Sequence, residues 1–348
     1  MLSWLDAAFG RYFGPLRLLD SFFFLAGVGF AVAALATWYA LPKLWRFLPK
    51  DRGRAFAVAA EASVGKPVSA GLIFVTIFCF VALIFVPAGA PPIRTLPFIA
   101  AACAVGYFDD RRGGFSEYQL AAMDLVVAFG AAMVIQGFGP AVIWLPGWKA
   151  ALTLSPWLSL PLSTAVIWLS INATNCSDGV DAVSGSLTAS AIAILGALLY
   201  VVIGNQVVAG HLGIPTNPEG ADWAIMAFVM AGAVCGYLWW NAPPSAVLMG
   251  DAGSRPLGLL IGMLVVATGN PLFLLLVGSV LLLNGATGLV KVALARFFGL
   301  KVLSSIRFPL HDHFRKELGW SNSQVLVRFM LLHLGLSALL IILVLKVR

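Results

Sequence analysis

Residues 21–41 read SFFFLAGVGFAVAALATWYAL, a run of 21 residues without one charged side chain. A helix that crosses a bilayer needs about 20 mostly apolar residues, and a backbone in lipid must pair its own polar groups. Nine further apolar runs follow along the chain. Three of them (95–108, 160–172 and 256–269) are short and border polar motifs, which predicts helices that stop early beside a cavity. The sequence therefore predicts an all-α polytopic membrane protein with about ten transmembrane helices, near 21–41, 68–87, 95–108, 118–136, 160–172, 183–204, 222–240, 256–269, 271–294 and 325–345.

The composition of the whole chain agrees with this prediction. Of its 348 residues, 60% are hydrophobic and 11% are charged, with a mean hydropathy of +0.94. A soluble domain carries roughly 25% charged residues because its surface faces water, so a soluble globule is excluded. The four cysteines show no ligand spacing, and the P-loop, dinucleotide and His-Glu-x-x-His motifs are absent from the sequence. An ATP-driven pump and an intramembrane zinc protease are unsupported, and no nucleic-acid partner is predicted.

The basic residues are divided unevenly between the two sides predicted for the membrane. Cytoplasmic loops are enriched in Lys and Arg, so the richer side is predicted to be cytoplasmic, with both termini outside in the periplasm. Residues 1–20 lack the apolar centre of a cleavable signal and are interpreted as an interfacial segment. Residues 295–324 are interpreted as a cytoplasmic loop, and residues 1–348 as one integral membrane domain. Sixteen of the 22 Lys and Arg residues fall on the richer side, and six on the other: Arg11, Arg17, Arg94, Lys149, Lys346 and Arg348.

Eleven of the 15 acidic residues also fall on the predicted cytoplasmic side or at helix ends facing it. Ionisable groups at such places are costly and indicate function. Gly106-Tyr107-Phe108-Asp109-Asp110-Arg111-Arg112 ends one apolar run with two adjacent carboxylates. Two such groups repel each other unless a cation shares them. The alternatives are a helix end neutralised by the two arginines, a divalent-cation site, and a base that activates a phosphate.

The run Asn172-Ala-Thr-Asn175-Cys-Ser-Asp178-Gly179-Val-Asp181 places a polar group at every third residue. Steps of three residues drift by about 60° around a helix, so the four groups cannot share one straight face. We expect a break at Gly179, with Asn172 and Asn175 ending one helix and Asp178 and Asp181 lining the turn. Capping of the helix end is the structural alternative, although four groups exceed what a cap needs.

A later motif isolates one carboxylate between glycines. It begins at Trp239-Trp240-Asn241 and continues as Met249-Gly250-Asp251-Ala252-Gly253-Ser254-Arg255-Pro256. The glycines allow a ligand to approach the backbone. Ser254 is expected to cap the next helix, with Pro256 in its first turn, so that the helix N-terminus offers N–H groups to an anion. A plain turn is the alternative.

Two of the four histidines lie in the longest basic loop, in Phe308-Pro309-Leu310-His311-Asp312-His313-Phe314-Arg315. His-x-His is a weak metal signal, and oxygen-rich sites favour magnesium, so we interpret these histidines as phosphate binders or proton handlers. Arg307 precedes them, and Arg315 and Lys316 follow. A solvated loop is the alternative. Lys66 directly precedes a predicted span, as a topology determinant or as a phosphate contact. Together these features predict a magnesium-bound diphosphate next to the bilayer.

The motifs and their order resemble the phospho-N-acetylmuramoyl-pentapeptide transferases, within the polyprenyl-phosphate N-acetylhexosamine-1-phosphate transferase superfamily. The resemblance spans roughly residues 25–345. Its most specific pieces are Phe108-Asp109-Asp110, the 172–181 run, the segment from Asn241 to Ser254, and residues 309–314. Gly319-Trp320-Ser321 and residues 325–329 are similar to the muramoyl branch in particular.

The resemblance implies a ten-helix enzyme of the bacterial inner membrane, surrounded by lipid, with its site in a cytoplasmic cleft. Such an enzyme transfers phospho-N-acetylmuramoyl-pentapeptide from its UDP-sugar to undecaprenyl phosphate. It releases UMP and forms lipid I, a precursor of peptidoglycan. The resemblance also implies Mg²⁺ as cofactor, a homodimer being left open. By position, Asp251 would bind the metal and Asp109 would deprotonate the lipid phosphate beside Asp110. The catalytic residues would be Asp109, Asp110, Asp251, His311 and His313, and the substrate contacts would be Lys66, Asn172, Asn175, Asp178, Asp181, Asn241, Arg307 and Asp312.

The chain departs from the family pattern at substrate-contact positions. Asp312 replaces the middle member of a three-histidine motif, Arg315 stands where an acidic residue is usual, and Leu248 replaces an aromatic that stacks on uracil. The basic residues after the paired aspartates are reduced to Arg111 and Arg112. Another UDP-N-acetylhexosamine substrate for a different envelope glycan, and a non-catalytic scaffold, are therefore alternatives.

A secondary transporter is a further alternative. It would carry ionisable residues near the bilayer midplane, and Asp124 is the acid within a predicted span.

Overall fold

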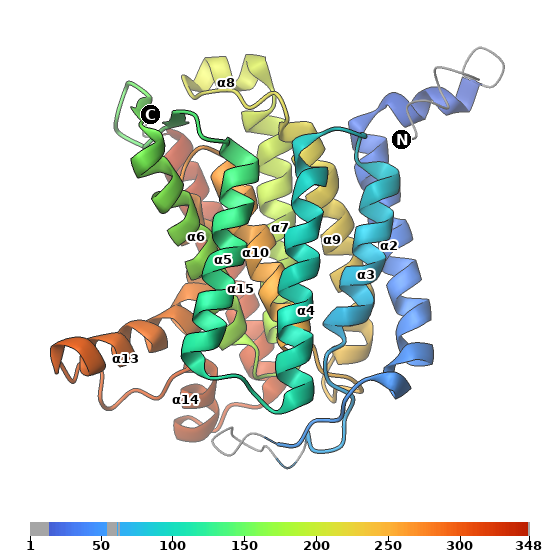
Figure 1. The fold of residues 1–348 in the computed structure, drawn as a ribbon, viewed down its shortest axis with the longest axis vertical. Helices are drawn as coiled ribbons and strands as arrows, with labels where there is room; N and C mark the ends of the chain where they lie inside the picture. The colour runs from blue at the N-terminus through green and yellow to red at the C-terminus, as the bar shows by residue number, and fades with distance from the viewer. Residues whose placement is uncertain (1–13, 54–60, 62, 347–348) are drawn as a thin grey trace.

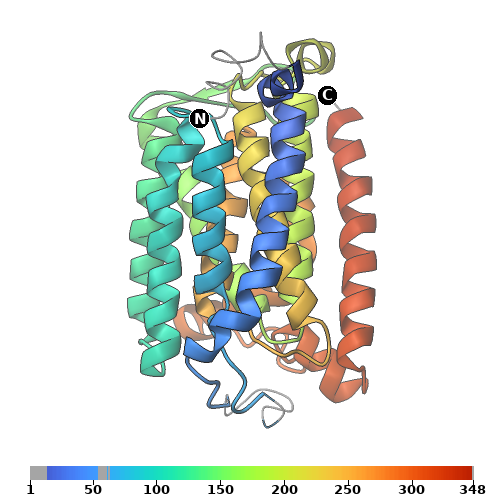
Figure 2. The same ribbon diagram turned by 90° about the vertical axis from the view of Figure 1, so that its right-hand side faces the viewer.

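The computed structural model describes residues 14–53, 61 and 63–346. The long helices run side by side between two ends of a bundle (Figures 1 and 2). They are α2 (Phe22–Leu44), α3 (Gly71–Phe85), α4 (Leu96–Arg112), α5 (Glu117–Gln136), α6 (Pro156–Ser177), α7 (Val183–Leu198), α9 (Gly220–Asn241), α10 (Asp251–Ala267) and α15 (Asn322–Lys346).

One further segment crosses the bundle in pieces: α11 (Phe273–Val277), α12 (Ser279–Leu281), a π-helical turn (Leu282–Ala286) and α13 (Thr287–Phe298). Figure 1 shows α13 leaving the bundle sideways. The end at which α4 finishes and α10 and α15 begin also carries α14 (Leu310–Glu317). We call it the basic end, because Lys43, Arg112 and Lys316 lie in the last turns of the helices there.

The opposite end carries the small elements. They are a 3₁₀ helix at Gly14–Asp20, α8 (Gln206–Leu212), and an antiparallel pair formed by β1 (Ala141–Ile143) and β2 (Leu152–Leu154). A second 3₁₀ turn, Pro91–Thr95, leads into α4. The first described residues and the end of α15 both lie at this end (Figure 1). Residues 1–13 of the expected interfacial segment are outside the described residues.

The helices have the length and composition of a multi-pass membrane protein. Within the described residues, six are long and apolar enough to cross a membrane: Phe22–Phe47, Glu117–Gln136, Val183–Ile203, Gly220–Asn241, Ser279–Phe298 and Asn322–Lys346. The all-α fold is confirmed, with three-residue strands as its only sheet among the described residues. Each of the ten apolar runs coincides with a helical segment, while ten membrane crossings remain a prediction.

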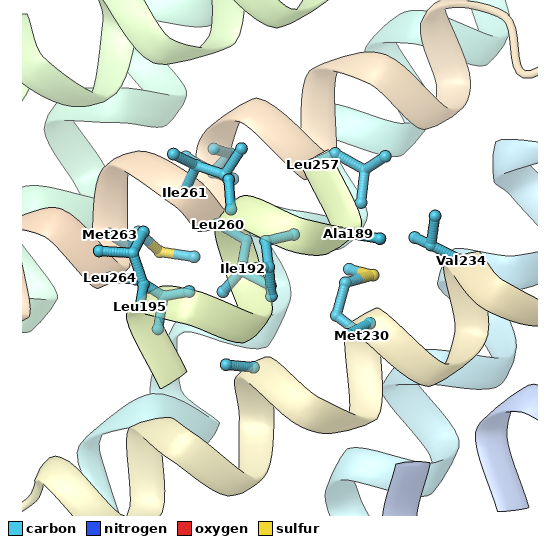
Figure 3. Packing of buried hydrophobic residues seen from close by; sticks show 14 of the residues in the cluster. Ala189, Ile192, Leu195, Met230, Val234, Leu257, Leu260, Ile261, Met263 and Leu264 are labelled. Carbon is cyan, nitrogen blue, oxygen red and sulfur yellow. The ribbon is translucent and has the colours of Figure 1, made fainter. Parts of the chain in front are cut away.

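The core forms around α10, which packs against α4, α6 and α7. Leu257, Leu260 and Leu264 of α10 are fully buried, and Figure 3 shows this helix meeting Ile192 of α7, with Met230 and Val234 of α9 beside them. The outer helices instead expose large apolar side chains, such as Leu35 of α2. A bilayer tolerates that exposure because lipid tails are as apolar as leucine. The helix that begins at Asp251 is therefore held rigidly at the centre of the bundle.

Two expectations about helix ends were wrong. The three short runs belong to helices of 17, 22 and 17 residues (α4, α6 and α10), because the polar motifs beside them are themselves helical. Helix α10 begins at Asp251 after Gly250, so Ser254 lies inside the helix and does not cap it. Inside the bundle these polar side chains find partners on neighbouring helices, so the helix does not have to stop where the apolar run stops.

Candidate functional site

Asp110 fills the N-terminus of α10. Its carboxylate accepts hydrogen bonds from the backbone N–H groups of Asp251 (3.2 Å) and Ala252 (3.4 Å), and from the Ser69 hydroxyl at 2.6 Å. The preceding Gly250 has φ +69°, and a Cβ there would collide with the Asp110 carboxylate. Asp110 thus occupies the anion site that we expected a ligand to use at this helix N-terminus.

Asp109 and Asp251 face each other across the contact between α4 and α10. The Asp109 carboxylate accepts a hydrogen bond from the Phe115 N–H at 2.5 Å and lies within hydrogen-bonding reach of the Asp251 carboxyl group. The two helices approach this closely because Gly106 of α4 lies against the backbone of Asp251 and Ala252, where a Cβ would not fit. The paired aspartates and Asp251, far apart in the sequence, therefore form one cluster at the basic end.

Arg255, one helical turn after Asp251 on α10, also contacts this cluster. The sequence motifs did not indicate this contact. Its Nε and Nη2 donate to one oxygen of Asp251 at 3.2 and 2.9 Å, and its Nη1 donates to Asp124 of α5. The side chains of Arg255 and Asp124 are 3% and 2% exposed. From the sequence, Arg255 is one of the sixteen basic residues assigned to the cytoplasmic side, and Asp124 is the acid within a predicted span. Their pairing shows that both belong to the interior.

A cavity of about 510 Å³ opens beside the cluster at the basic end. Gly250 and Leu248 lie in its wall, which places it next to the start of α10. Three separate sequence motifs supply much of this lining. The predicted site residues that line it are Asn175, Asp178, Asp181, Asn241, Arg307, His311 and Asp312.

The loop after α6 and the loop after α9 are tied together at one side of the cavity. Ser245 donates to both oxygens of Asp181, from its hydroxyl at 2.8 Å and its backbone N–H at 3.2 Å, and Lys66 donates to the same hydroxyl at 3.1 Å. The Asn241 amide accepts from the Ala182 N–H and donates to the Val247 carbonyl, each at 2.8 Å. Asn241 thus braces the wall, and Ser245 is a linking residue that the sequence motifs did not indicate.

The 172–181 run folds as expected. Helix α6 ends at Ser177, Asp178 follows in extended conformation, and α7 begins at Val183. Asn172 donates to the Trp168 carbonyl of its own helix at 2.9 Å, and Asn175 donates to Ser254 of α10 at 3.0 Å. The two asparagines therefore secure the end of α6, while Asp178 and Asp181 reach the cavity wall.

The histidine motif forms the first turns of α14. His311 is buried, its backbone N–H donates to Asn284 at 2.9 Å, and its ring Nδ1 lies 3.1 Å from the same amide. Its Nε2 lies so close to Gly179 that a Cβ there would meet it at 2.6 Å. Asn284, on the π-helical turn before α13, is another residue that the sequence motifs did not indicate. It anchors α14 against the cavity.

The two departures at Asp312 and Arg315 form one ion pair. Asp312 lies 3.5 Å from Arg315 Nη1 and 3.9 Å from Arg307 Nε. An acid at the usual histidine position is thus matched by a cation at the usual acidic position, one helical turn later. His313 lies outside the cavity lining, where its Nδ1 accepts from the Arg307 N–H at 3.4 Å.

The donor set suits a metal that takes few protein ligands. Across the described ranges, no three His, Cys, Asp or Glu side chains are grouped so that they could hold a metal ion by themselves. Magnesium is usually bound by one or two carboxylates together with substrate phosphates and water. Asp109 and Asp251 interact with each other and adjoin Gly250 in the cavity wall, although neither lies in the lining itself, and this pair fits that requirement.

Comparison with known proteins agrees with this arrangement. The sequence model of glycosyl transferase family 4 matches residues 93–269. The phospho-N-acetylmuramoyl-pentapeptide-transferase of Treponema pallidum (strain Nichols) is 44% identical over 325 residues, covering 92% of this chain and 90% of that protein. The protein of the same name from Bartonella quintana (strain Toulouse) is 32% identical over 240 residues, covering 67% of this chain and 66% of that protein. This chain therefore belongs to the phospho-N-acetylmuramoyl-pentapeptide transferases, within glycosyl transferase family 4.

Proposed function

We propose that the protein transfers phospho-N-acetylmuramoyl-pentapeptide from its UDP-sugar to undecaprenyl phosphate, releasing UMP. The observation that carries this proposal is the convergence of Asp109, Asp110 and Asp251 next to Gly250 in the wall of the cavity, in a chain of this family. A cavity of about 510 Å³ has the size of a small-molecule site. The nucleotide would lie along Asp178, Asp181 and Arg307.

The proposed topology is ten spans with both termini outside and the cavity at the cytoplasmic surface of the inner membrane. The basic end supports this orientation, because the Lys and Arg residues in the last turns of α2, α4 and α14 lie there with the cavity. A cytoplasmic cavity would receive a soluble UDP-sugar, while the lipid phosphate would reach the same edge from the bilayer.

Asp109 and Asp251 would hold Mg²⁺ there. When bound, the ion would neutralise the diphosphate and stabilise the UMP that leaves. The chain's own groups would do the rest. An oxygen of the lipid phosphate attacks the phosphorus attached to the sugar, and the bond from that phosphorus to UMP breaks. Asp109 takes or steers the proton of the lipid phosphate, while Arg307 and Lys66 bind anionic oxygens.

Because one phosphoanhydride replaces another, the reaction needs little net bond energy. The protein contributes mainly by positioning two anions and neutralising their charge. Asp110 serves this purpose indirectly, since its bonds to the α10 N-terminus and to Ser69 lock α4 and α10 together.

The test is UMP release by the purified protein in detergent, with undecaprenyl phosphate and a panel of UDP-sugars. We expect turnover with UDP-N-acetylmuramoyl-pentapeptide, and its loss in Asp251→Ala with folding retained. Turnover only with another UDP-N-acetylhexosamine would reassign the sugar. Wild-type UMP release by Asp251→Ala would refute the proposed site.

A further inference from the structure

Arg255 is a buried cation held between two carboxylates from different helices. It contacts Asp251 one turn earlier on α10 and Asp124 on α5, and all three side chains are at most 10% exposed. Two of its nitrogens grip the same oxygen of Asp251, at 3.2 and 2.9 Å. Asp124 accepts a hydrogen bond from the third nitrogen, Nη1. The guanidinium is therefore fixed at both edges.

Stability alone does not explain why this position carries a charged pair. Removing a carboxylate and a guanidinium from water costs several kcal/mol per ion, and well-packed apolar residues in place of such a pair often give an equally stable or more stable protein. The neighbouring positions on α10 show that the local packing accepts apolar side chains, because Ala252 and Leu259 are fully buried. The pair differs from them in touching Asp251.

The contact constrains how Asp251 can present its carboxylate. Arg255 holds one oxygen of Asp251 through two hydrogen bonds, which restricts rotation of the carboxylate while the same group interacts with Asp109. Arg255 also places a positive charge beside the three carboxylates gathered at the start of α10. Partners of this kind orient metal-binding groups, and their loss typically costs about 10- to 100-fold in metal affinity or activity.

We propose that Arg255, anchored by Asp124, is a positioning residue that aims Asp251 at a divalent cation shared with Asp109. This inference rests on the proposed function, since it assigns the cation to the site described there. Asp124 acts through Arg255 and touches neither the cation nor the substrate.

The test removes both charges at once. In Asp124→Leu combined with Arg255→Met, the pair is replaced by apolar side chains of similar size, so neither member is left buried without the other, while Asp251 loses its contact with Arg255. Unfolding in detergent measures stability, and the electron paramagnetic resonance of Mn²⁺ measures binding without turnover. We expect the double variant to stay folded, with Mn²⁺ binding about 10- to 100-fold weaker. A matched control is Gln136→Leu, which removes hydrogen bonds to Ser159 and Ser163 at the opposite end and should leave Mn²⁺ binding unchanged.

Wild-type Mn²⁺ affinity in the folded double variant would overturn the proposal. If that variant does not fold, Arg255→Lys decides instead. Lysine keeps the charge but lacks the planar fork that bridges two carboxylates, so we expect Mn²⁺ binding weakened roughly tenfold. Unchanged binding would again overturn the proposal. Failure of the proposed function looks different, because the wild-type protein itself would then bind no Mn²⁺ and release no UMP.

Discussion

Replacing Gly106 by alanine tests whether the contact between α4 and α10 creates the site. A Cβ at this position would overlap the backbone atoms of Asp251 and Ala252, which cannot move aside as a side chain could. Carbon atoms pack best at about 3.5–4.0 Å, so the two helices would have to separate locally by roughly 1 Å. That displacement would lengthen the hydrogen bonds that Asp110 accepts from α10 and would change the distance between Asp109 and Asp251.

The expected magnitudes follow from this displacement. Overpacking a close contact lowers the free energy of unfolding by about 1–3 kcal/mol. The better helix propensity of alanine offsets roughly 0.5–1 kcal/mol of that loss. The rate of UMP release should show the larger change, since a misplacement of about 1 Å can cost on the order of 100-fold in rate. Thermal unfolding in detergent and initial rates of UMP release measure the two effects separately.

Gly27→Ala is the matched control. Gly27 also lies inside a helix, α2, but a Cβ there has nothing within 4 Å. This variant should keep full activity and gain slightly in stability. If Gly106→Ala unfolds at the same temperature as Gly27→Ala and releases UMP at the wild-type rate, the packing of α4 on α10 does not position the site.

Three further outcomes are expected. Ser69→Ala removes the 2.6 Å hydrogen bond to the Asp110 carboxylate and should lower the free energy of unfolding by about 1.5–3 kcal/mol; an unchanged unfolding curve would contradict that role. Asn284→Ala removes the contacts to the backbone N–H and the ring of His311, each worth about 1 kcal/mol, and should raise KM for the UDP-sugar several-fold. A change in kcat alone would contradict a role of Asn284 in positioning α14. Chelation by EDTA should stop UMP release and added Mg²⁺ should restore it, so turnover in excess EDTA would disprove the metal requirement.

The candidate site was partly readable from the sequence. Asp109, Asp110 and Asp251 stood out because carboxylates at the ends of apolar runs are costly, and the structure brings them together. The 172–181 run was resolved correctly into a helix end and a turn, since its three-residue spacing cannot follow one helical face. In each case the signal was local, a polar residue in a place where hydrophobicity alone would not put one.

The partners of these residues were not readable in the same way. Ser69, Ser245 and Asn284 are ordinary polar residues in sequence, and they acquire their importance from contacts made across 27 to 179 positions of the chain. The start of α10 was misplaced for a similar reason. Ser254 looks like a helix cap, but the N–H groups one turn earlier are satisfied by Asp110 of another helix.

Hydropathy, charge distribution and motif spacing were enough to determine a membrane-embedded helical protein with its acids gathered toward one side, because lipid imposes strong constraints on each segment separately. The pairing of Arg255 with Asp124 and Asp251, and the filling of the α10 N-terminus by Asp110, were decided only when the helices packed. Whether a buried charge is a topology signal, a liability or part of a site depends on which opposite charge lies beside it, and that is a property of three-dimensional packing.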